Sequence, residues 1–377
     1  MSSLKALTLH RKLKGKLSIT SKLPLNSKET LSLFYTPGVA QAVNFISKNK
    51  ETVHDLTIKH NTIAVVTDGS AVLGLGNVGP EAALPVMEGK CAIFAEFAGI
   101  NAFPICLATQ NIDAIVETIR HISPVFAGIN LEDISAPRCF EIENRLQNLG
   151  IPVMHDDQHA TAIVVLAALI NATKIVHKKI SACKIVVVGC GAAGTAIIKL
   201  LANFKPKEIL AIDRQGILSP KRTDLAGYKK QLLTIINRGN TNGNLRDAAY
   251  HADVLIGVSA KGIFTKDIIK SLHKDSIVFA LANPDPEADP SDAKKWGVKI
   301  YASGRSDYPN QVNNALVFPG FFKGLLKNHI TKITDQMKIN AANALSSLIK
   351  NPTPQKFIPS IFDKRIIHVI SQSIASS

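Results

Sequence analysis

The chain has 377 residues, which is long enough to bury a large core and to form two domains. Hydrophobic residues make up 46% of it and charged residues 19%, an ordinary balance for a soluble globular protein. The formal net charge of +15 would suit a nucleic-acid partner, but the lysines are scattered and only 6% of residues are aromatic. We therefore expect a solvated basic surface and no nucleic-acid binding.

The five cysteines are odd in number and show no C-x-x-C spacing, which indicates free thiols in a reducing compartment. The first residues lack the apolar core of a secretory signal. The longest apolar run, residues 161–172, is shorter than the ~18 residues that a membrane-spanning helix requires. We expect a soluble cytoplasmic protein that does not bind membranes.

Buried strands are predicted in the first part of the chain at residues 62–67 and 125–131, and a short one at 151–154. Each of them ends in polar residues, and ligands of open α/β sheets collect at the carboxyl ends of the strands. A long helix is expected to follow the third strand, from about residue 160 to residue 176. These patterns predict a first α/β domain over residues 1–155.

A β-α-β pattern follows, with a strand at residues 184–188, a glycine-rich turn, a helix at 195–203 and a second strand at 208–212. Further strands are predicted at 253–257, 276–282 and 298–302. Strands that alternate with helices are typical of a doubly wound Rossmann-like sheet, which we place at residues 156–314. Residues 315–377 are expected to be helical and to pack back on the first domain.

The turn at residues 189–194 reads G-x-G-x-x-G, a motif that is weak alone but follows a strand and opens a helix here. Gly189 permits the tight turn, Gly191 lets the backbone approach a pyrophosphate, and Gly194 allows close helix–strand packing. The motif predicts a dinucleotide site. The predicted contacts of the turn are Gly189, Gly191, Ala192, Ala193 and Gly194.

Asp213 ends the next strand, at the distance expected for a carboxylate that binds the adenosine ribose. An acidic residue there favours NAD, because it would repel the 2′-phosphate of NADP. Arg214 beside it could permit NADP. We expect NAD to be preferred.

Two pairs of carboxylates follow predicted strands, Glu132–Asp133 and Asp156–Asp157. Hard oxygen ligands of this kind suit Mg²⁺ or Mn²⁺. His155 and His159 are four residues apart, but a zinc protease needs H-E-x-x-H, and Asp156 stands where the glutamate should be. The sequence therefore predicts a magnesium or manganese site, and histidines that form hydrogen bonds.

Several motifs in order make the chain similar to the malic enzymes, specifically their short bacterial form. They lie at residues 34–40, 69–79, 85–90, 130–134, 155–161, 281–284 and 304–314. The resemblance covers nearly the whole chain. It implies a two-domain α/β enzyme, a homodimer, that oxidises malate with NAD(P) and a divalent metal and releases pyruvate and CO2.

The resemblance also implies roles for individual residues. Tyr35 would be the acid that protonates the enolate and Lys90 the base that takes the hydroxyl proton of malate, for which its pKa must be lowered. Asp156 would support Lys90. The expected metal ligands are Glu132, Asp133 and Asp157. The expected substrate contacts are Lys90, Asn283 and Asn314, of which the two asparagines would contact malate or the nicotinamide ribose.

One departure concerns the malate carboxylate. The large eukaryotic enzymes carry an arginine where this chain has Ala71, an absence that the short forms share. Two alternatives to oxidative decarboxylation remain. One is a redox-neutral malolactic reaction, whose enzymes resemble the larger forms, so the short length of this chain speaks against it. The other is a nucleotide-binding protein without catalysis.

Overall fold

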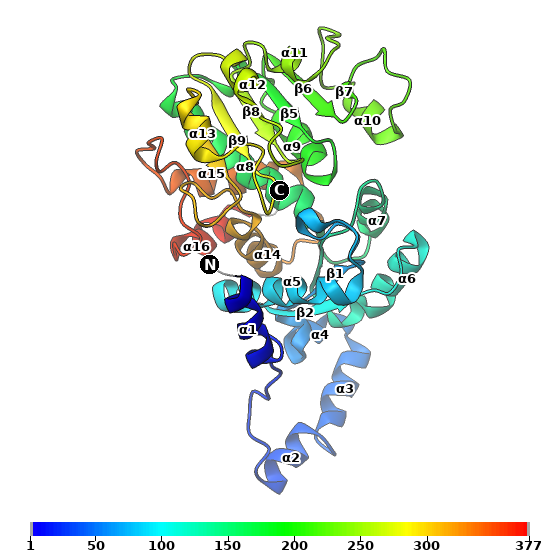
Figure 1. The fold of residues 1–377 in the computed structure, drawn as a ribbon. Helices are drawn as coiled ribbons and strands as arrows, with labels where there is room; N and C mark the ends of the chain where they lie inside the picture. The colour runs from blue at the N-terminus through cyan, green and yellow to red at the C-terminus, as the bar shows by residue number, and fades with distance from the viewer. Residues whose placement is uncertain (1–2, 375–377) are drawn as a thin grey trace.

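The computed structural model describes residues 3–374 and contains two α/β domains, with an N-terminal arm that projects from the first one (Figure 1). The two sheets are separate, with four and six strands. The two-domain α/β fold expected from the sequence is therefore confirmed.

The first sheet has the strand order β2-β1-β3-β4, and every pair in it is parallel. Helix α5 packs on one face, while α6 and α7 cover the other through a separate hydrophobic cluster. The elements of this domain are β1 (Thr62–Thr67), β2 (Asn101–Cys106), β3 (Gly128–Leu131), β4 (Val153–His155), α4 (Val53–Leu56), α5 (Pro80–Ile93), α6 (Ile112–Ile122) and α7 (Arg138–Leu146).

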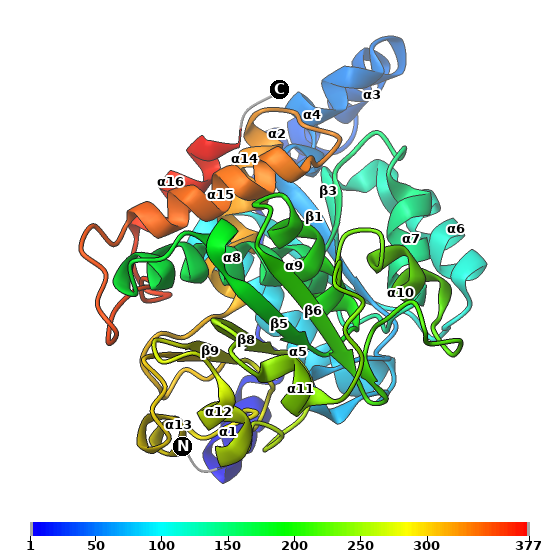
Figure 2. The ribbon, with the colours of Figure 1, turned by 90° about the horizontal axis from the view of Figure 1, so that it is seen from above.

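The second sheet has the order β10-β9-β8-β5-β6-β7 and is parallel except for β7. Ile185 and Val187 of β5 face α8 and α9, whereas Val186 and Val188 face α11 and α12, so both faces are covered (Figure 2). Its strands are β5 (Lys184–Val188), β6 (Glu208–Asp213), β7 (Gly216–Ile217), β8 (Val254–Gly257), β9 (Ile277–Ala280) and β10 (Ile300–Ser303). Its helices are α9 (Ala192–Ala202), α10 (Gly227–Leu232), α11 (Leu245–Ala249), α12 (Lys266–Ser271) and α13 (Pro290–Lys295).

Helix α8 (Asp156–Ile175) connects the domains and packs against α9 and α15. It is long and apolar enough to cross a membrane, but 72% of its apolar window is buried inside the molecule, as in the core helix of a globular protein. The helix begins at Asp156, about four residues before the predicted start. Carboxylates in the first turn of a helix are favoured by the helix dipole, so Asp156 and Asp157 begin the helix and do not precede it.

The C-terminal segment is helical, as expected, and consists of α14 (Phe318–Lys327), α15 (Asp335–Ser347) and α16 (Arg365–Ser373). Helix α14 contacts the first domain. The ring centroid of Phe94 lies 4.7 Å from that of Phe318 and 5.5 Å from that of Phe322. One hydrophobic cluster therefore joins both domains. The domain boundaries at residues 155 and 314 stay a prediction.

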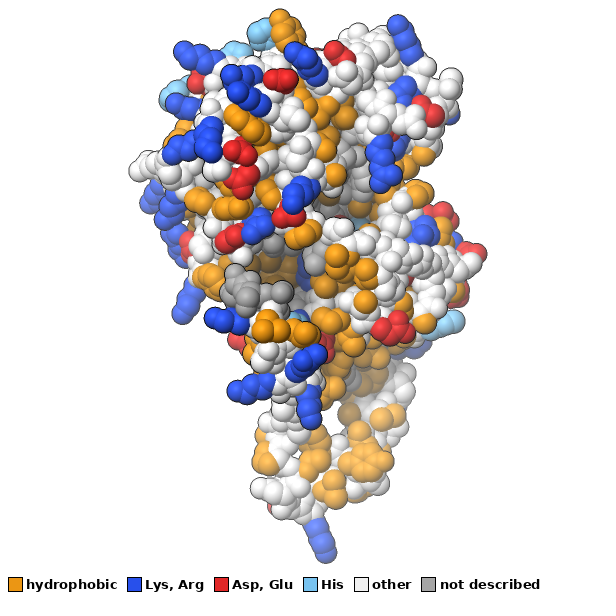
Figure 3. Space-filling view, viewed as in Figure 1, with side chains coloured by type: hydrophobic (Ala, Val, Ile, Leu, Met, Phe, Trp, Pro, Cys, Tyr) orange, Lys and Arg blue, Asp and Glu red, His pale blue; other side chains and the backbone are white. Residues whose placement is uncertain are grey.

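The arm consists of α1 (Ser3–Leu13), α2 (Lys28–Phe34) and α3 (Val39–Lys48), and its far end extends away from the body (Figure 1). No residue of α2 or α3 is buried. Large apolar side chains gather on this arm (Figure 3), and the exposed ones on α2 and α3 are Leu31, Leu33, Phe34, Val39, Val43 and Phe45.

Candidate active site

The carboxylates predicted to bind metal follow neighbouring parallel strands of the first sheet. The register pairs Leu131 of β3 with His155 of β4, so Glu132 and Asp156 leave the sheet side by side. The backbone N–H of Asp133 donates to Asp157 Oδ2 at 2.8 Å. Glu132, Asp133 and Asp157 each offer an oxygen within 4.8 Å of the others. The structure therefore brings the three predicted ligands together.

Lys90 reaches this group from α5, and its Nζ lies 3.0 Å from Glu132 Oε1 and 2.5 Å from Asp156 Oδ2. Asn314 comes from the end of the second domain and donates to the same oxygen of Asp156, at 2.5 Å. Lys90 Nζ also lies 4.5 Å from the ring centroid of Phe318. Four residues predicted separately thus form one connected group, and Asp156 is its centre.

The charges of this group decide the protonation of Lys90. Burial by itself lowers the pKa of Lys90, but Asp156, Glu132 and Asp157 outweigh burial and hold its pKa above the usual value. The lowered pKa that a general base needs would therefore have to come from a bound cation that offsets these carboxylates. Burial and neighbouring carboxylates also raise the pKa of Glu132 well above its usual value, against the opposing effect of Lys90.

The donor set fits a divalent cation. Glu132 and Asp156 contact Lys90 Nζ, Asp133 and Asp157 lie beside them, and Glu132, Asp133 and Asp156 are almost wholly buried. Excess negative charge in a buried site is unfavourable unless a cation offsets it. Three convergent carboxylate oxygens are the ligands that Mg²⁺ and Mn²⁺ prefer, with water or substrate at the remaining positions.

The start of α8, which carries two of these carboxylates, is held by the buried Glu143 of α7. Glu143 accepts the N–H of His155 at 2.8 Å and the Nε2 of Gln158 at 3.0 Å, and its carboxylate lies 2.9 Å from His159 Nε2. Burial alone would raise the pKa of Glu143, but His159 and these donors lower it to about 2. His159 thus forms hydrogen bonds, as predicted, whereas neither ring nitrogen of His155 has a hydrogen-bond partner among the described residues. Glu143 was not identified from the sequence.

The glycine-rich turn has the shape that a dinucleotide needs. Gly189 has a φ of +105°, a backbone conformation that favours glycine. A Cβ on Gly194 would lie 1.7 Å from the carbonyl oxygen of Gly189, so this position requires glycine as well. No atom of another described segment lies within 4 Å of a Cβ placed on Gly191, so there is space beside its backbone for a ligand. Helix α9 begins at Ala192, three residues earlier than predicted, so its N-terminal N–H groups face this turn.

Asp213 ends β6 as predicted and is bound by two cations that sequence reasoning missed. Arg222 Nη1 donates to its Oδ1 at 2.7 Å, and Lys229 Nζ donates to its Oδ2 at 2.6 Å. Burial would raise the pKa of Asp213, but these hydrogen bonds lower it to about 2. Arg222 also binds Asp224, and Arg214, which the sequence suggested as a cofactor ligand, is exposed.

The loop over residues 69–79 of the first domain meets the second domain at Asn283. A Cβ on Gly74 would lie 2.0 Å from the carbonyl oxygen of Asn283, so the two backbones touch. On the other side, a Cβ on Gly304 would lie 2.9 Å from Asn283 Nδ2. Asn283 is therefore fixed where the domains meet.

Tyr35 does not join this group within one copy of the chain. It ends α2 at the far end of the arm, and its side chain is 67% exposed. The figures place α2 far from α5, which carries Lys90 (Figure 1).

Comparison with known proteins matches both domains to one family. Residues 159–377 match the malic enzyme NAD-binding domain, and residues 14–111 and 108–147 match the malic enzyme N-terminal domain. The chain is 47% identical to the bifunctional malic/malolactic enzyme of Bacillus subtilis, over 99% of this chain and 92% of the relative. It is 40% identical to the NADP-dependent malic enzyme of Halomonas elongata, over 99% and 92%.

A solved structure agrees with these matches. The NAD-dependent malic enzyme of Thermotoga maritima superimposes with a TM-score of 0.95 at 45% identity, over 99% of both chains. Both domain types, the near-complete coverage and the shared three-dimensional structure lead to one conclusion: this chain belongs to the malic enzyme family.

Proposed function

We propose that the chain oxidises (S)-malate and decarboxylates it to pyruvate and CO2, with reduction of NAD or NADP and with Mg²⁺ or Mn²⁺ in the acidic group. The proposal rests above all on Lys90, whose Nζ contacts both Glu132 and Asp156 beside the three predicted metal ligands. Relatives named as malic enzymes over almost the whole chain support it.

The proposed reaction gives Lys90 and Asp156 specific roles. A bound NAD or NADP would accept the hydride from C2 of malate. We assign to Lys90, oriented by Asp156, the removal of the proton from the C2 hydroxyl. The C3–C4 bond then breaks, CO2 leaves, and its bonding electrons form the enolate of pyruvate, which takes a proton at C3. A bound divalent cation would supply Lewis-acid polarisation of the C2 oxygen and would offset the carboxylates that raise the pKa of Lys90.

We infer that the C3 proton comes from Tyr35 of a second copy in a homodimer. The site of one copy lacks Tyr35, which lies on the exposed arm. Exposed apolar side chains gathered on a projecting arm indicate an interface, and we infer that in a two-fold dimer each arm reaches the body of the other copy. The Lys90 group of one copy and Tyr35 of the other would then form each site.

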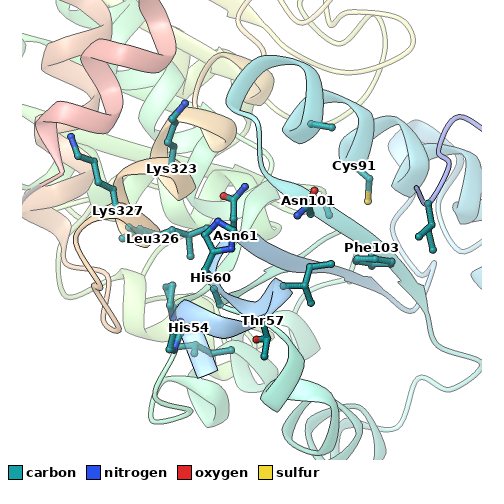
Figure 4. A pocket seen from close by; sticks show the side chains of 18 of the residues that line it. His54, Thr57, His60, Asn61, Cys91, Asn101, Phe103, Lys323, Leu326 and Lys327 are labelled. Atoms are coloured by element: carbon teal, nitrogen blue, oxygen red, sulfur yellow. The ribbon is translucent and has the colours of Figure 1, made fainter. Parts of the chain in front are cut away.

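A groove lies beside the arm. It has a volume of about 1500 Å³ and lies between the segment at residues 17–22 and the body. Figure 4 shows His54, His60 and Asn61 facing into it, with Lys323 and Lys327 from α14 on one side and Phe103 on the other. We assign this groove, with its mixed polar and apolar lining, to contacts with the second copy.

We infer that NAD is preferred because Asp213 stays ionised and would repel a 2′-phosphate. We expect Asp213→Asn to raise the ratio of kcat/KM for NADP to that for NAD about tenfold or more. The repulsion would be removed, and Arg222 and Lys229 would lose the carboxylate that neutralises them. Steady-state kinetics with both cofactors measure the ratio, and Asp292→Asn, which removes the surface partner of Lys295 on α13, is the control. An unchanged ratio would contradict the assignment.

The same site could release lactate, if bound NADH reduced pyruvate before it left. The Bacillus subtilis relative is named bifunctional and is of similar length, so chain length does not separate the two reactions as we expected. We propose oxidative release as the main reaction. With malate, NAD and Mn²⁺, we expect pyruvate and NADH in equal amounts, measured by chromatography and absorbance. Lactate without NADH would overturn this choice.

We also propose that the protein works in the cytoplasm. All five cysteines are free, four of them buried, which agrees with a reducing compartment.

A further inference from the structure

A buried carboxylate outside the reaction scheme joins two loops of the second domain. Glu287 is 0% exposed, and its Oε1 accepts the N–H of Ser259 at 2.9 Å while its Oε2 accepts the N–H of Ala282 at 3.0 Å. Ser259 follows β8 and Ala282 follows β9. Burial raises the pKa of Glu287, and the backbone N–H donors lower it only in part.

The backbone is shaped to admit this carboxylate. A Cβ on Gly257, the last residue of β8, would lie 2.5 Å from Glu287 Oε1, so only glycine lets the side chain approach. The carbonyl oxygen of Glu287 also accepts the N–H of Phe264 at 3.0 Å, which fixes the loop that carries it. Because both oxygens are used, glutamine cannot replace glutamate without turning an amide N–H toward another N–H.

Both joined loops touch the residues that we assign to the cofactor. Val258, next to Ser259, packs on the dinucleotide turn, because a Cβ on Gly189 would lie 2.5 Å from its carbonyl oxygen. Ala282 is followed by Asn283, whose backbone meets Gly74 of the first domain. A shift in either loop would therefore move the turn or the domain contact.

We propose that Glu287 is a positioning residue for the dinucleotide: it holds the loop after β8, which packs on the glycine-rich turn, in place against the loop after β9, which leads to Asn283. This inference rests on the proposed function for the identity of the cofactor. Glu287 acts through Ser259 and Ala282 and does not itself take part in the reaction.

The test is direct binding of NADH, measured by fluorescence titration of the full chain without malate or metal. We expect Glu287→Gln to raise the Kd for NADH and the KM for NAD about tenfold, because one N–H of the pair loses its acceptor. Glu287→Asp keeps both oxygens on a shorter side chain and should give a smaller increase. Mn²⁺ affinity should not change, because the predicted ligands lie in the other half of the active site.

A matched control separates positioning from plain stability. Val278→Ala removes buried volume from β9, in the hydrophobic cluster that also contains Ala288, the neighbour of Glu287 in the chain. This variant should lower Tm with no change in the Kd for NADH. If both Glu287 variants lowered Tm but bound NADH like the unchanged protein, the role would be structural and the proposal wrong. An unchanged protein that bound no NADH would instead overturn the proposed function.

Discussion

Lys90→Ala should lower kcat for malate oxidation by about 100- to 10,000-fold, the range that a general base contributes, while NADH binding stays unchanged. Lys90 contacts two carboxylates of the acidic group. Within residues 3–374, which the structure describes, it does not contact the glycine-rich turn. The substitution should therefore lower kcat and leave the affinity for NADH unchanged. Steady-state kinetics and NADH fluorescence titration of the same preparation measure both.

Loss of a buried charge can also impair folding, so two controls accompany this variant. Added methylamine should restore part of the activity of Lys90→Ala, because it can replace the missing amine. Lys59→Met removes another buried lysine, whose Nζ donates to the carbonyl oxygens of Ser123 and Pro124 at 3.1 and 3.0 Å, and should lower Tm without lowering kcat. A Lys90→Ala protein with undiminished kcat would contradict the assigned role.

Mixing two inactive variants should restore activity if the site is shared between copies. Tyr35→Phe and Lys90→Ala are each expected to be almost inactive as homodimers. A heterodimer would contain one site with both residues intact and one site with neither. Random exchange makes half of the dimers mixed, so about one quarter of the activity of the unchanged protein should return.

The mixture of Tyr35→Phe with the double variant serves as the control, since no arrangement of these two chains gives an intact site. Differently tagged copies show by mass whether heterodimers formed. Heterodimers that stay inactive would place Tyr35 and Lys90 in the same copy. A fully active Tyr35→Phe homodimer would remove Tyr35 from the reaction, and a monomer in solution would contradict the dimer itself.

The meeting of the carboxylates could be predicted because it depends on local rules. Polar residues directly after buried parallel strands meet at one sheet edge, and the observed register places Glu132 beside Asp156. The start of α8 was predicted too late, because His155 to His159 was interpreted as a loop although its carboxylates suit a first helical turn.

Other features depend on contacts between distant segments. Strand β2 was missed because Pro104 interrupts its pattern, and the structure accommodates this proline by placing β2 at the edge of the sheet. Arg222 and Lys229 come from the segment after β7 and reach Asp213 only through the tertiary fold. For Tyr35, the family motif suggested a role, but its place on the arm could be seen only in the structure.

The central claim is that a divalent cation is held beside Lys90 by three carboxylates. Anomalous scattering from a crystal grown with Mn²⁺ tests it directly. We predict one strong peak within about 2.2 Å of an oxygen from each of Glu132, Asp133 and Asp157. A protein that turned over malate in those conditions while its Mn²⁺ lay elsewhere, or bound at none of the three, would contradict the account.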